Sequence, residues 1–141
     1  MTSAPNSPSI VAQKGAQLAC EAHAVALART PATIEDELVF TIEEIIAREN
    51  ALPKLISLIY KNFSWELFSQ ALAQSDLSPD SPIARLIGER GKKEAERLLF
   101  MIIELVSSVA YNGIILGEPQ SMDEMRAPLL AAVRRLLKEE A

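Results

Sequence analysis

The sequence has little of the material from which most active sites are built. It contains one cysteine, Cys20, and one histidine, His23, in 141 residues. A single cysteine excludes a disulfide bond within the chain, and no other cysteine or histidine is present to complete a zinc site. The motifs GxGxxG, GxxxxGKS/T, HExxH and GxSxG are also absent. We therefore expect a protein that is not an enzyme and that needs no cofactor or metal.

One arrangement with chemical potential remains, because Cys20 and His23 lie one helical turn apart. Such a pair can ligate a metal or activate a thiolate when further partners are nearby. Ala19, Ala22 and Ala24 surround the two residues, and this setting favours plain packing or surface placement over chemistry.

Glycine and aromatic residues are also scarce, at five glycines and 5% aromatics. The alternation of apolar and polar residues that is typical of strands is absent, and alanine, leucine and glutamate, which are good helix formers, are abundant. With 49% hydrophobic residues, the length suits one compact domain. The prediction is an all-α fold, with five to six helices in an orthogonal or up-and-down bundle.

Positive charge is in deficit, with 14 Lys and Arg against 19 Asp and Glu and a net charge of −5. This balance argues against a nucleic-acid footprint over the whole domain. The first nine residues, MTSAPNSPS, lack the positive charge and the apolar core of a signal peptide. We predict a disordered tail over residues 1–9, a single helical domain over residues 10–141 and a cytoplasmic location.

The most prominent apolar segment of the sequence is RLLFMIIELVSSVAYNGIIL, residues 97–116. Its apolar side chains fall on nearly all sides of a helix, which predicts a helix buried nearly all round, on its own neighbours and on a second copy of the chain. The stretch approaches the length of a membrane span. Glu104, Ser107, Ser108 and Asn112 interrupt it, so we favour a buried helix of a soluble protein.

Helix-capping and helix-breaking residues predict where the other helices begin and end. Ser7-Pro8 should start a first helix that ends at Thr30-Pro31, and Thr33 should cap a second. A third helix should open at Pro53, a short one should span Ile83–Ile87 and end at Gly88, and a central one should run from Gly91 to Gly117. The last helix should start at Ser121 with Glu124 in a capping box, and Pro128 predicts a kink or a broken first turn within it.

The second predicted helix carries many carboxylates. Its apolar stripe is Ile34, Leu38, Ile42 and Ile45, continued by Glu49, while Glu35, Asp36, Glu37, Glu43 and Glu44 mark its solvated side. Clustered acids can serve acid–base or metal chemistry. On an amphipathic helix they are more often a solvated face, which is the interpretation that we favour here.

The C-terminal part of the chain resembles a known family. The segment EAERLLFMIIELVSSVAYNGIILGEPQSMDEMRAPLLAAVRRLL is similar to the last two helices of the regulatory domain of TetR/AcrR-type transcriptional regulators. ENALPKLISLIYKNFSWELF resembles an earlier helix of that domain, which opens on Leu-Pro. The resemblance covers residues 51–141 and implies that the last two long helices pair with their copies in a dimeric four-helix bundle.

The resemblance also implies two sets of site residues. The dimer interface would lie on Leu98, Ile102, Leu105, Val109, Leu129, Val133 and Leu136. A ligand pocket for a small, often apolar, effector would involve Phe40, Ile56, Tyr60, Phe63 and Phe100. Plain core packing is the alternative for these aromatic residues.

The chain departs from the family at its N-terminal end. Such regulators begin with a helix-turn-helix domain, and TIEEIIAREN followed by LIYKNF matches that motif only superficially. The spacing is too long, the glycine of the turn is absent and no basic recognition surface follows, so residues 41–63 are predicted to be core helices. No direct nucleic-acid binding and no membrane binding are expected.

Two functions follow as hypotheses. The first is a non-enzymatic, homodimeric regulatory domain that senses a small hydrophobic ligand. The second is a helical protein–protein interaction module, such as an anti-activator or adaptor, that uses the same fold without a ligand. An enzyme with a carboxylate site would need clustered, inward-pointing acids.

Overall fold

The computed structural model describes residues 8–54, 56–57 and 82–139 of the chain. The described residues form helices and their connections and contain no strand, which confirms the all-α prediction. Helix α1 spans Pro8–Ala28, α2 Ile34–Ala51, α5 Pro82–Arg90, α6 Lys92–Tyr111 and α7 Met122–Glu139. A π-helical turn, η1, spans Asn112–Leu116 and continues α6.

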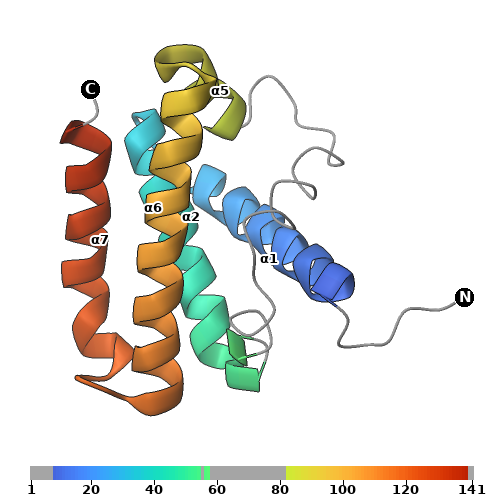
Figure 1. Cartoon of the computed structure of the whole chain (residues 1–141), viewed down its shortest axis with the longest axis vertical. Helices are drawn as coiled ribbons and strands as arrows, with labels where there is room; N and C mark the ends of the chain where they lie inside the picture. Colours follow the sequence, from blue (N-terminus) through green and yellow to red (C-terminus); the bar gives the residue numbers. More distant parts are fainter. Residues whose placement is uncertain (1–7, 55, 58–81, 140–141) are drawn as a thin grey trace, which may run out of the picture.

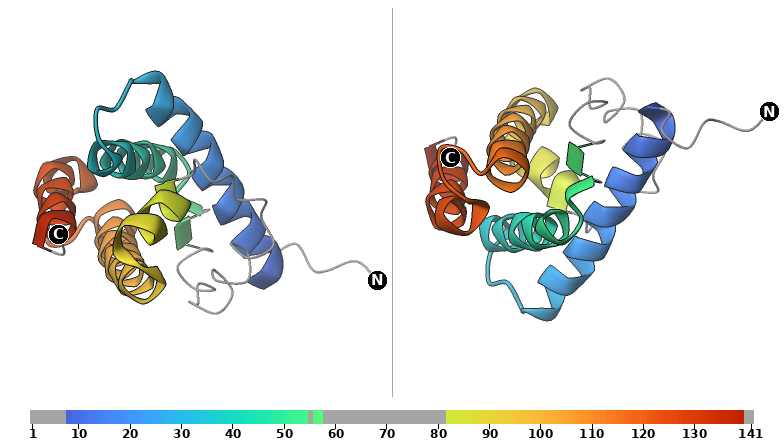
Figure 2. Two further views of the ribbon diagram at one scale, coloured as in Figure 1. Left: turned by 90° about the horizontal axis from the view of Figure 1, so that it is seen from above. Right: turned by 90° about the horizontal axis from the view of Figure 1, so that it is seen from below.

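Three long helices, α2, α6 and α7, run side by side and enclose the core (Figure 1). Helix α7 is antiparallel to α6 and lies at one edge of the molecule, while α1 crosses α2 obliquely on the opposite side (Figures 1 and 2). Helix α5 packs on α6 at the end where the two helices join. The arrangement is a small three-helix bundle to which α1 and α5 are added.

The inner face of α6 supplies much of the core. Ala95, Leu98, Leu99, Ile102, Val106 and Ala110 are all buried on this helix. They meet Val39 and Ile46 of α2 and Leu129, Val133 and Leu137 of α7 in one continuous cluster. Burying one such leucine or isoleucine side chain contributes about 1.5–3 kcal/mol, so this face is the main source of stability.

Several predicted helix boundaries are confirmed. The Thr33 side chain accepts a hydrogen bond of 3.1 Å from the Asp36 backbone N–H, and α2 begins at the next residue, Ile34. Gly117 has a left-handed backbone with a φ of 65°, and the helical continuation of α6 ends there. Helix α7 begins directly after Ser121 and runs without interruption through Pro128.

Two predicted boundaries need comment. Helix α5 does not end at Gly88 but continues to Arg90. Arg90 donates a hydrogen bond of 2.6 Å to the Leu137 carbonyl of α7, and this anchor outweighs the modest helix-breaking tendency of glycine. The chain is helical at Pro53 and Lys54, while most of the third predicted helix lies outside the described residues.

Gly113 sets the distance between η1 and α7. It is buried, and a Cβ atom added to it would lie 2.7 Å from Met125 Cε and 3.1 Å from Met122 Cα. The methionine tip can move, but the backbone of α7 cannot do so without displacing the helix. The turn between α6 and α7 is therefore held close by the absence of a side chain at this position.

We expect Gly113→Ala to lower the free energy of unfolding by about 1–2 kcal/mol, because the added methyl group overpacks the contact with α7. Gly88→Ala is the matched control, since nothing lies within 4 Å of its added Cβ. That variant should raise stability by about 0.5–1 kcal/mol through helix propensity. Chemical denaturation followed by circular dichroism measures both, and equal effects would contradict the close contact.

Candidate functional site

The described members of the predicted ligand pocket differ in their surroundings. Ile56 is buried in the core. Phe40 lies beneath the Arg29 guanidinium, whose carbon is 4.1 Å from the ring centroid. Phe100 is 43% exposed on the outer side of α6, and Tyr60 and Phe63 lie outside the described residues. The pocket stays a prediction.

The predicted dimer interface divides into two groups. Leu98, Ile102, Leu129 and Val133 are buried within a single chain, where they form part of its own core. Leu105, Val109 and Leu136 are partly buried at the margin of that core. A second copy would therefore meet the second group and the outward side chains beside it.

The outer side of α6 is not fully covered within a single chain, and its burial against a second copy stays a prediction. Phe100 and Met101 are 43% and 42% exposed, and Leu116 is also exposed. The helix Lys92–Leu116 contains an 18-residue window with a mean hydropathy of 1.9, enough by length and composition alone to cross a membrane, and 33% of that window is buried in the molecule.

The most connected polar group in the described residues is the Glu37 carboxylate. His23 Nε2 of α1 lies 2.9 Å from its Oε2 atom, and Arg85 of α5 donates a hydrogen bond of 2.9 Å to its Oε1 atom. Glu37 is only 4% exposed, although the sequence placed it on the solvated side of α2. The prediction is wrong because α1 and α5 both pack over this part of the helix.

This cluster, His23–Glu37–Arg85, joins α1, α2 and α5 through their side chains. Both oxygens of the carboxylate are satisfied, which is the condition under which a buried charge is tolerated. Cys20 is exposed. In the described ranges no three His, Cys, Asp or Glu residues come together as a metal site would require. The geometry of the cluster therefore fits a structural clamp on α1 rather than a reactive centre.

Glu37→Gln should lower the free energy of unfolding by about 1–3 kcal/mol, because a hydrogen bond between charged groups is lost and an amide N–H₂ is turned toward a donor. Glu43→Gln is the control, since its 2.7 Å pair with Arg29 is largely open to solvent and exposed pairs contribute under about 1 kcal/mol. Denaturant titrations compare the two. A Glu37 variant as mild as the control would contradict the clamp.

Glu49 is the second buried carboxyl group, near the C-terminal end of α2. It is 9% exposed, and its Oε2 atom has no hydrogen-bond partner. Burial raises the pKa of Glu49 to about 7. The sequence indicated that Glu49 would be buried, because this residue continues the apolar stripe of α2. By contrast, the hydrogen bond from Arg134 lowers the pKa of Asp36 on the outer side of the same helix.

The raised pKa of Glu49 predicts a specific dependence of stability on pH. The protonated form is the one that folding favours, so its stabilisation is complete below the ordinary value of 4.5 and is lost as pH rises through about 7. One pKa unit corresponds to about 1.4 kcal/mol, so the loss above neutral pH is on the order of 3 kcal/mol.

Glu49→Gln should remove this dependence, since the amide is neutral at every pH. Unfolding titrations of both proteins between acidic and mildly alkaline pH test the expectation. A difference in stability between wild type and variant that stays constant across this range would show that Glu49 does not titrate near neutrality in the folded protein.

Comparisons with known proteins add no relatives: no family model, no curated protein and no solved structure matches this chain.

Proposed function

We propose that this chain is a non-enzymatic helical regulatory module that acts through protein–protein contacts. The observation that carries the proposal is the exposed apolar surface on α6, where Phe100 and Met101 are adjacent and each more than two-fifths exposed. Phenylalanine and methionine are enriched in the centres of protein interfaces and are depleted from ordinary surfaces.

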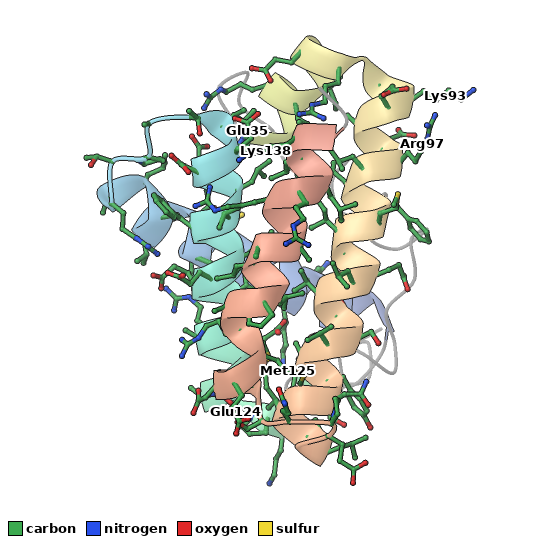
Figure 3. The ribbon with its side chains drawn as sticks, turned by 90° about the vertical axis from the view of Figure 1, so that its left-hand side faces the viewer. Glu35, Lys93, Arg97, Glu124, Met125 and Lys138 are labelled. Atoms are coloured by element: carbon green, nitrogen blue, oxygen red, sulfur yellow. The ribbon has the colours of Figure 1, made fainter. Side chains whose placement is uncertain are left out.

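The surroundings of these two side chains fit an interface rim. Arg97 lies one turn before them and forms a 3.8 Å ion pair with Glu94, and Glu104 is exposed one turn after them. An apolar centre bordered by charged residues is the usual layout of a contact between soluble proteins. In Figure 3, Arg97 and Lys93 point away from α7, so the surface is separate from the contact between α6 and α7.

A ligand-sensing domain of the TetR type is the second candidate. Two observations favour it: the last two long helices form an antiparallel pair at one edge of the molecule, as the resemblance implies, and the Glu49 carboxyl is buried without a partner for its Oε2 atom. A cationic group on an apolar effector would pair with that oxygen. The first candidate is preferred because Phe100, one of the predicted pocket residues, is 43% exposed.

A photo-crosslinking experiment tests the proposal. A benzophenone amino acid at Met101 should yield one discrete crosslinked protein in cells that produce the chain, and the product should disappear when Phe100→Ser is added. The control position is Asn50, which is exposed on α2 and should yield no such product. Circular dichroism verifies that each variant is folded.

Two results would overturn the proposal. A small molecule retained at one equivalent per chain in native mass spectrometry, without a specific crosslink, would establish the sensing function instead. Crosslinking that is equal at Met101 and Asn50, or that is insensitive to Phe100→Ser, would show that this side of α6 is an ordinary surface.

A further inference from the structure

Helix α1 lies outside the core that the other described helices share. Among its described side chains Leu18, Ala22 and Ala26 are buried, and none of them belongs to the buried cluster that joins α2, α5, α6 and α7. In the described part of the chain α1 packs chiefly on α2, on the side away from α7 (Figures 1 and 2). Two of these three side chains are alanines, so they bury little apolar area although the two helices approach closely.

Polar contacts fasten α1 to α2 at two points. His23 Nε2 lies 2.9 Å from Glu37 Oε2. Arg29, directly after the end of α1, lies 2.7 Å from Glu43 and 3.5 Å from Glu44. The Arg29 pairs are partly open to solvent, where ion pairs contribute little to stability. These contacts can therefore break without disturbing the apolar core.

The connection between α1 and α2 is strained at one residue. Thr30 has a φ of 52°, in the left-handed region that β-branched residues rarely adopt. It also precedes Pro31, and a residue before proline favours an extended backbone. Helix α2 has its own cap at Thr33. A rotation of Thr30 to the extended region would relieve the strain and move α1 away, while α2 keeps its first turn.

We propose that α1 is a releasable strap that opens as a unit about Thr30 while α2, α5, α6 and α7 stay folded. Proteins open in such units at free energies below that of global unfolding. Glu37 keeps a partner in the open state, because Arg85 of α5 donates a hydrogen bond of 2.9 Å to it.

The open and closed states differ in charge as well as in shape. Opening removes the Arg29 cation from Glu43 and Glu44 on the surface of α2. The strap does not rest on the proposed function, because Phe100 and Met101 lie on α6.

Hydrogen exchange of the full chain tests the strap. Mass spectrometry follows the exchange at increasing denaturant concentrations below the unfolding transition. Amides of α1 should exchange at least tenfold faster than the slowest amides of α6 and α7. Their rate should also depend less steeply on denaturant, because opening of the strap exposes less surface than global unfolding does.

Val133→Ala separates opening of the strap from unfolding of the whole molecule. Val133 of α7 is 0% exposed and belongs to the core cluster. Its truncation should raise the exchange rates of α6 and α7 about tenfold or more. The exchange rate of α1 should stay within about twofold of the wild-type value, because the core remains intact when the strap opens.

Two further variants act on the strap itself. Arg29→Gln should raise the exchange rate of α1 about threefold to tenfold, since it removes both ion pairs and the contact with the Phe40 ring. Arg126→Gln is the matched control, because its 3.6 Å pair with Asp123 lies on α7, and α1 should stay within about twofold. Thr30→Asn should lower the rate about threefold, because asparagine tolerates the left-handed region.

The inference is overturned if α1 exchanges at the rate of α6 with the same dependence on denaturant, or if Val133→Ala accelerates both helices equally. In either case α1 opens only with the whole molecule. Complete lack of protection in α1 would also contradict the strap, since α1 would then not be docked. Wild-type exchange of α1 in Arg29→Gln or in Thr30→Asn would contradict the proposed contacts and the hinge.

Discussion

Burial of the inner face of α6 is the contact on which the rest of the structure depends. Leu98, Ile102 and Val106 belong to one buried cluster with residues of α2 and α7, so burial of the same cluster stabilises all three helices. Antiparallel α7 reaches this position only because Gly113 lets the chain turn close against Met122. The hydrophobic effect stabilises the packed helices, and the missing side chain of Gly113 allows the turn after α6 to approach α7 closely.

The buried charges act in a different way from the apolar core. Glu37 is surrounded by donors from α1 and α5, and a satisfied network of this kind fixes the relative positions of helices more than it adds net stability. Glu49 lacks that support and is therefore most compatible with the fold when it is protonated. Two glutamates on one helix thus have different surroundings, because one has partners for both oxygens and the other does not.

The outer side of α6 is apolar around Phe100 and Met101. The affinity of a partner for such a surface depends on its shape as well as on the area that is buried.

The sequence by itself determined the class of fold and most helix ends, because these depend on local interactions. Thr33 caps α2 through its own side chain, and Gly117 ends the continuation of α6 through its backbone conformation. Gly88 was misjudged, since Arg90 anchors α5 to α7 from beyond the range of any local rule.

Only the tertiary structure decided which polar and apolar side chains lie inside. Glu37 is buried because α1 and α5 cover it, and Phe100 is 43% exposed because it lies outside the core to which the inner face of α6 contributes. The same holds for the exposed apolar surface on α6, which only the tertiary structure revealed. A periodic pattern gives the face of a helix on which a residue lies, but the surroundings of that face depend on the packing of distant segments.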